Sequence, residues 1–196
     1  YEMLTVNEHR AEQLVSHTAI ARLHLVLSND DRGELNTLLL HAPDGRLRLR
    51  HLLPAAQIPV FQVSMPHDLD TAGALRLGQA LAPLRAQGVL VLASGSMTHN
   101  LYEFRHAHTA AADYAVEFTH WIRQAVTGNA VDQLVDYRRR APHAERAHPT
   151  EEHYLPLLVA MGARHAGDVT TVVDGGITHG VLSMESYAWG LPTSHP

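Results

Sequence analysis

The chain has 196 residues, a mass of 21.6 kDa and an apolar fraction of 45%. This length fits one compact domain, and this apolar fraction argues against wholesale disorder. The formal net charge is −5 and all 15 basic residues are arginine, so the basic excess typical of nucleic-acid-binding proteins is absent. The sequence has no cysteine, which excludes disulfide scaffolds, cysteine-ligated zinc and thiol nucleophiles.

No apolar run reaches the roughly 18 residues of a membrane span, and the first ten residues lack the apolar centre of a signal peptide. We therefore expect a cytoplasmic protein with no membrane or nucleic-acid partner. Histidine is over-represented, with 16 residues. Because imidazole titrates near neutral pH and is the commonest metal ligand, a few of these histidines are candidates for chemistry and most are expected on the surface.

The first 50 residues form a polar zone with weak structural signals. Helical periodicity is faint from Glu8 to Leu27, and Pro43-Asp44-Gly45 predicts a turn. The alternation of arginine and leucine over 46–50 is compatible with a half-exposed strand.

The signals are sharper in the middle of the chain. The sequence predicts a strand over 58–65, a helix over 74–84 with capping candidates at 68–71, and an apolar strand over 89–94. Gly88 can end the helix in the left-handed conformation. A strand that is apolar on both faces suits the middle of a parallel sheet, so we expect an α/β fold with a mostly parallel central sheet flanked by helices.

The second half of the chain alternates between helical and extended patterns. The Pro-containing segment 142–149 is predicted as a loop, and Thr150 is the expected N-cap of the helix that follows it. Helices are predicted over 110–125, 131–139 and 151–164, and strands over 169–174 and 181–189.

His99 is the most informative single position. It follows the apolar strand on the turn that begins Ser94-Gly95-Ser96, and open α/β sheets bind their ligands at this edge. A histidine there, with Asn100 beside it, can bind a metal or act as a general base. The alternative is a histidine whose ring is hydrogen-bonded to the loop backbone.

His153 is the second candidate, in the first turn of the helix predicted over 151–164. Glu152 and His153 are adjacent, so on a helix they would point to different sides. The alternative is a surface histidine in an exposed first turn. For five weaker candidates a solvated surface position is the favoured interpretation: His106, His108, His143, His148 and His179.

Several segments occur in the order and spacing of a known enzyme family. They include a Ser-Gly-x-x-x-His-Asn turn and a Glu-His-x-Leu-Pro-Leu-Leu helix, and their combination resembles the class III extradiol ring-cleaving dioxygenases. The resemblance is to the DOPA-dioxygenase-type branch of the LigB-like superfamily and covers roughly residues 48–190. The segments are Ala56–Ser64, Gly88–Leu101, Pro149–Leu158 and Ser183–Gly190.

This resemblance implies a LigB-like fold and a non-haem Fe(II) site that opens a catechol-type ring with O₂. His99 matches the family's active-site histidine, which lies at the metal and serves as ligand and as acid/base, and His153 matches a later metal-binding histidine. Zn²⁺ can occupy the same nitrogen-rich site without redox chemistry. The implied partners are a small aromatic diol and O₂, and homo-oligomerisation is left open.

The beginning of the chain departs from the family pattern. Two further family histidines, in an early Ser-His-Gly turn and a later His-Trp turn, have no match in this sequence. Ser16-His17-Thr18 resembles the Ser-His-Gly turn only weakly. We expect an atypical N-terminal segment over 1–50 and a partial dioxygenase-like catalytic domain over 51–196. Because catalytic sites generally have three protein ligands, activity is expected to be impaired unless His17, His24 or His41 completes the set. The alternatives are an inactive or metal-binding remnant and a Zn-dependent hydrolase.

Overall fold

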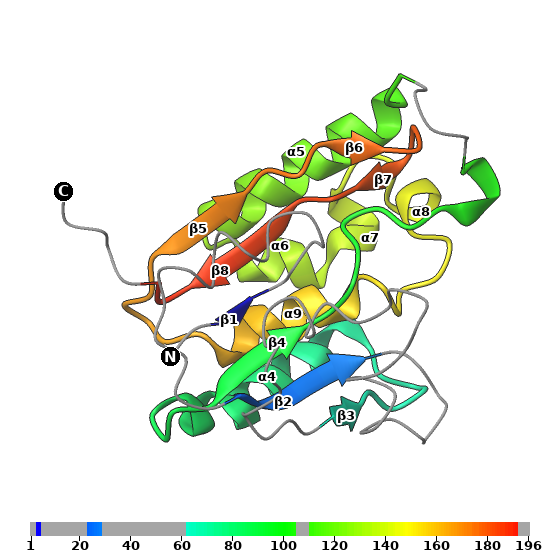
Figure 1. Cartoon of the computed structure of the whole chain (residues 1–196). Helices are drawn as coiled ribbons and strands as arrows, with labels where there is room; N and C mark the ends of the chain where they lie inside the picture. The colour runs from blue at the N-terminus through cyan, green and yellow to red at the C-terminus, as the bar shows by residue number, and fades with distance from the viewer. Residues whose placement is uncertain (1–2, 5–22, 29–61, 105–109, 192–196) are drawn as a thin grey trace, which may run out of the picture.

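A computed structural model describes residues 3–4, 23–28, 62–104 and 110–191 of the chain (Figure 1). These residues form an α/β arrangement of short strands and packed helices. The strands are β1 (Met3–Leu4), β2 (Leu23–Ser28), β3 (Gln62–Ser64), β4 (Leu90–Ala93), β5 (Thr170–Val173), β6 (Ile177–Thr178), β7 (Leu182–Ser183) and β8 (Ser186–Trp189). The helices are α4 (Thr71–Arg85), α5 (Asp113–Thr127), α6 (Val131–Val135), α7 (Tyr137–Arg140), α8 (Ala144–Ala147) and α9 (Leu155–Ala163), with a short 3₁₀ helix η1 (Leu101–Glu103).

The main sheet has six strands in the order β3-β2-β4-β1-β8-β5, and β6 and β7 form a separate hairpin. β4 pairs in parallel with β1 and β2, and β2 pairs in parallel with β3. On the other side β8 pairs antiparallel with both β1 and β5. The described sheet is therefore mixed, and a mostly parallel central sheet stays a prediction.

Helix α4 has the ends that its sequence predicts. Asp70 caps its N-terminus, where the carboxylate accepts a 2.6 Å hydrogen bond from a backbone N–H of the first turn. At the other end Gly88 has φ +82°, and the N–H of Val89 bonds back to the Leu84 carbonyl at 3.2 Å. This is a Schellman ending, in which the left-handed glycine turns the chain directly into β4.

Three predicted elements differ in the structure. The helix predicted over 131–139 is broken at Asp136, whose φ of −97° and ψ of 27° are not helical, so α6 and α7 are separate. The loop predicted over 142–149 contains α8, because the left-handed backbone of His143 redirects the chain into one helical turn. The single strand predicted over 181–189 is interrupted between β7 and β8.

Several sequence predictions concern residues outside the described part of the chain. These include the strand signal before Gln62, the turn at Pro43-Asp44-Gly45 and the domain boundary at residue 50, which all stay predictions. The N-terminal helical signal is wrong over its last residues, because Leu23–Ser28 is strand β2. Within the described part of the chain, no helix combines the length and the apolar character needed to cross a lipid bilayer.

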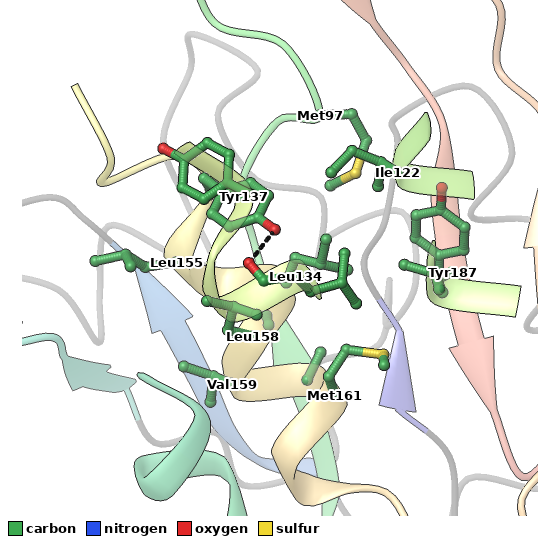
Figure 2. Packing of buried hydrophobic residues seen from close by; sticks show 14 of the residues in the cluster. Met97, Ile122, Leu134, Tyr137, Leu155, Leu158, Val159, Met161 and Tyr187 are labelled. Atoms are coloured by element: carbon green, nitrogen blue, oxygen red, sulfur yellow. Dashed lines mark hydrogen bonds between the residues drawn. The ribbon is translucent and has the colours of Figure 1, made fainter. Parts of the chain in front are cut away.

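The core is built around α9, which is buried along nearly its whole length. A helix that is apolar on all sides must be covered on all sides, and α9 packs against α4, α6 and β4. Figure 2 shows its side chains in one cluster with residues from α5, α6, α7, β8 and the loop after β4. The labelled residues are Met97, Ile122, Leu134, Tyr137, Leu155, Leu158, Val159, Met161 and Tyr187.

Helices α4 and α9 cross through two glycines. A Cβ added at Gly78 would lie 2.0 Å from the Val159 carbonyl oxygen, and one at Gly162 would lie 2.2 Å from the Leu75 carbonyl oxygen. These neighbours are backbone atoms, so they cannot yield without moving a helix. The missing side chains therefore set how closely the two helices approach.

We predict that Gly78→Ala lowers the free energy of unfolding by roughly 2–4 kcal/mol, because the methyl group forces the helices apart. In an open helix the same change would stabilise by about 1 kcal/mol. Gly167→Ala is the matched control, since nothing lies within 4 Å of its added Cβ, and it should shift stability by less than about 1 kcal/mol. Urea unfolding followed by circular dichroism measures both; equal effects would contradict the close crossing.

A buried ion pair joins the end of α4 to the segment just before β5. Arg85 is 3% exposed, and its guanidinium lies 2.5 Å from the Asp168 carboxylate. The same carboxylate accepts the backbone N–H of His165 at 2.7 Å. Desolvation is the largest single influence on Asp168 and raises its pKa, but the bonds from Arg85 and His165 and their charges together lower it below its ordinary value.

We predict that Asp168→Asn costs about 3 kcal/mol of stability at pH 7, because it removes the carboxylate that pairs with the buried Arg85. A carboxyl group whose pKa is lowered on folding contributes stability above its unfolded pKa, near 3.8 here, and loses it as the pH falls through the folded value. The difference between wild type and variant should thus narrow below about pH 4. Asp132→Asn, at a position 73% exposed, is the control and should change little at any pH.

Candidate functional site

The loop that leaves β4 carries His99 and is tied to a segment far along the chain. The N–H of Ser96 donates to the His153 carbonyl at 2.9 Å, and the N–H of His99 donates to the Ala147 carbonyl at 2.8 Å. Gly95 makes this approach feasible, because a Cβ there would lie 2.4 Å from the same His153 carbonyl oxygen. The backbone of this loop therefore runs directly against the residues before α9.

His153 lies in a turn before α9 and not inside a helix, which corrects the sequence prediction. The helix begins at Leu155, with Pro156 in its first turn. Proline lacks an N–H and fits the first helical positions, where that group would have no partner within the helix. Thr150 is not the N-cap: its hydroxyl donates to the Glu152 carboxylate at 2.7 Å.

The structure brings His99 and His153 together. Their rings are stacked, with centroids 3.4 Å apart and planes inclined by 27°. Glu152 joins them, and one donor atom from each of the three residues lies within 4.8 Å of the other two. The expectation that Glu152 and His153 point to different sides is wrong, because it assumed helical geometry at a position that forms a turn.

The charges of this cluster suit a cation. Desolvation lowers the pKa of His99, an effect that the Glu152 charge opposes in part, so the ring is neutral at neutral pH and has a free lone pair. Burial is the largest influence on Glu152 and raises its pKa, but the Thr150 hydroxyl, a backbone amide and the nearby histidines together lower it. Glu152 is therefore ionised.

These donors fit a transition-metal ion. Imidazole nitrogens and carboxylate oxygens bind Zn²⁺ and Fe(II) at about 2.0–2.2 Å, so any two ligands of one ion lie at most about 4.4 Å apart. The cluster of His99, Glu152 and His153 is close to that size already. Two histidines and one carboxylate with open positions is also the donor set of many non-haem Fe(II) oxygenases.

Among the histidines whose side chains the structure describes, no other candidate joins the cluster. His143 lies on the surface, with its Nε2 3.0 Å from the Glu117 carboxylate, and His179 stacks on Phe104 at 4.4 Å. His148 is fully buried, so its predicted surface position is wrong. His17, His41, His106 and His108 lie outside the described residues, and of His24 only the backbone, in β2, is described.

Sequence reasoning missed Glu152 as a donor and His148 as a core residue. Pro156 was the available signal for Glu152, because a proline in the first turn moves the helix start past His153. For His148 the local sequence gives no comparable signal, since its burial depends on aromatic residues from α5 and α7.

Comparison with known protein families shows the family to which this chain belongs. The family described as the catalytic LigB subunit of aromatic ring-opening dioxygenase matches residues 49–179. The chain belongs to this family. The match contains the loop of His99 and the turn of His153, so the stacked pair lies inside the region that defines the LigB relationship.

Curated LigB relatives are similar over the same part of the chain. The 4,5-DOPA dioxygenase extradiol of Beta vulgaris is 37% identical over 136 residues, which are 69% of this chain and 51% of that protein. The enzyme of the same name from Escherichia coli is 34% identical over 143 residues, which are 71% of this chain and 52% of that protein. The chain thus spans about half the length of the curated relatives it matches.

A solved structure supports the LigB-like fold. The crystal structure of uncharacterized protein JW3007 from Escherichia coli K12 superimposes with a TM-score of 0.79 at 25% sequence identity. The superposition covers 96% of this chain and 98% of that one.

We predict that Gly95→Ala disrupts the cluster, because its methyl group would push the His99 loop away from the His153 carbonyl and from Pro156. Zn²⁺ affinity, measured by competition with a chromophoric chelator, should fall at least about tenfold. Gly167→Ala makes the same chemical change in open space and should leave Zn²⁺ affinity unaltered. Wild-type affinity in Gly95→Ala would show that the close approach does not position the donors.

Proposed function

We propose that this chain acts as an extradiol dioxygenase that opens a catechol-type ring with O₂ at a non-haem Fe(II) centre. The observation that carries the proposal is the convergence of His99, His153 and Glu152, with donor atoms within 4.8 Å of one another, inside the LigB match. The names of the curated relatives point to DOPA-type catechols as the first substrates to test.

His153 and Glu152 would hold the metal, and His99 would serve at the metal and as the acid/base. Fe(II) bound there would supply the redox chemistry that joins O₂ to the ring. The neutral ring of His99 can accept a phenolic proton as the diol binds and return it to the product. The half-buried position of His99, between the loop and the turn, keeps one side of the ring away from bulk water.

Zn²⁺ fits the same donors, because it also takes nitrogen and carboxylate ligands. It is not redox-active, so the zinc-loaded chain would lack oxygenase turnover. The cluster of two histidines and one carboxylate also fits a second candidate, a metal-binding remnant of the family without turnover. Metal binding and oxygen consumption separate these functions.

The test is anaerobic loading of the purified chain with Fe(II), followed by oxygen uptake and visible absorbance with a DOPA-type catechol. We predict ring-opening turnover that falls at least about 10²-fold in His99→Ala and Fe(II) affinity that falls at least about tenfold in Glu152→Gln. His143→Ala, at an exposed histidine outside the cluster, is the control and should match wild type. Metal binding without oxygen uptake would favour the remnant, and turnover that survives His99→Ala would contradict the assigned role.

A further inference from the structure

The His99 loop is also held by a side chain that the reaction does not use. His148 is 0% exposed, and its Nε2 lies 2.9 Å from the carbonyl oxygen of Met97, two residues before His99. Every other histidine whose side chain the structure describes is at least partly exposed. His148 belongs to the segment that continues to His153, so this contact joins the two halves of the proposed metal centre.

The hydrogen bond has a defined direction. A carbonyl oxygen can only accept, so Nε2 of His148 carries the proton and Nδ1 is the unprotonated nitrogen. Nδ1 is buried and, among the described residues, has no hydrogen-bond partner. Burial lowers the pKa of His148 to about 3, which keeps the ring neutral and preserves this tautomer at neutral pH.

Aromatic rings fix the orientation of the imidazole. Its centroid lies 5.6 Å from that of Phe118, 6.2 Å from that of Tyr137 and 5.5 Å from that of Tyr154. An unpaired nitrogen in such surroundings destabilises the folded state, so an apolar side chain would suit this cluster better on packing grounds alone. Compared with an apolar side chain at this position, His148 contributes one further interaction, the hydrogen bond to the Met97 carbonyl.

We propose that His148 is a positioning residue, whose Nε2–H bond to the Met97 carbonyl sets the separation of His99 and His153. This proposal rests on the proposed function for its consequence, metal binding, but not for its geometry. Two backbone bonds already tie the same segments at Ser96 and His99. Asn100 Nδ2 also donates to the Arg146 carbonyl at 2.8 Å, past the His99 end of the loop. The His148 bond is the side-chain contact that holds Met97, which lies between the two backbone anchors.

Two variants of similar size isolate the hydrogen bond. His148→Gln keeps an N–H donor within reach of the Met97 carbonyl, whereas His148→Met fills comparable space without one. Phe118→Leu is the control, because it loosens the same aromatic cluster and removes no polar contact. Each protein is first checked for folding by circular dichroism and thermal melting.

The expected result is that His148→Met weakens Zn²⁺ binding at least about tenfold, while His148→Gln stays within about threefold of wild type. Phe118→Leu should lower the melting temperature and leave Zn²⁺ affinity intact. In apo protein, proton NMR should show strong cross-peaks between the His99 and His153 rings, whose centroids are 3.4 Å apart, in wild type and His148→Gln but not in His148→Met. Equal losses in both His148 variants, or a folded His148→Met that behaves as wild type, would overturn the positioning role.

Two NMR measurements test the positioning role even if the wild-type chain binds no metal or His148→Met does not fold. If the wild-type chain binds no metal, the proposed function fails, and the ring cross-peaks still decide the positioning role. If His148→Met does not fold, ¹⁵N NMR of the wild-type imidazole decides it: protonation at Nε2 supports the bond to Met97, and protonation at Nδ1 overturns it.

Discussion

The candidate site depends on backbone hydrogen bonds between two segments that are distant in sequence. The amides of Ser96 and His99 donate to the carbonyls of His153 and Ala147, respectively. Gly95 lies so close to the His153 carbonyl oxygen that a Cβ at this position would clash with it. Because these bonds join the backbone of the two segments, they restrain the Cα atoms of His99 and His153, and the proposed role of the His148 bond is added to that restraint. The stacking of the two rings follows from that anchoring.

The anchoring is itself supported by the core and by the C-terminal hairpin. The glycine contacts of α4 and α9 set the position of α9, and the turn that carries His153 leads directly into that helix. On the other side the hydroxyl of Thr98 donates to the Val181 carbonyl at 2.7 Å and accepts the N–H of Ser183 at 2.7 Å. The His99 loop is thus held between two parts of the fold.

Local sequence signals predict the elements whose causes are local. Asp70 and Gly88 mark the ends of α4, and the apolar run of β4 is buried as expected. The antiparallel position of β8 and the burial of His148 depend on residues far along the chain, so periodicity does not reveal them. The pairing of His99 with His153 came from family resemblance, since spacing alone does not bring two distant loops together. The sequence does not predict Glu152 as a donor, because its pattern indicates helix from residue 151, whereas the helix begins at Leu155.

The charges of the cluster bear on the proposed binding of a catechol. Two neutral imidazoles and one ionised carboxylate carry a single negative charge, so a divalent ion held by them keeps one positive charge. In the proposed function that remaining charge would favour the deprotonated form of a bound diol, and the neutral His99 ring would accept the released proton when its lone pair is not bound to the ion. A third imidazole in place of Glu152 would leave more positive charge at the metal and stabilise a catecholate further. The Glu152 carboxylate would therefore reduce the electrostatic stabilisation of a bound catecholate, while it would increase the affinity of the cluster for the cation.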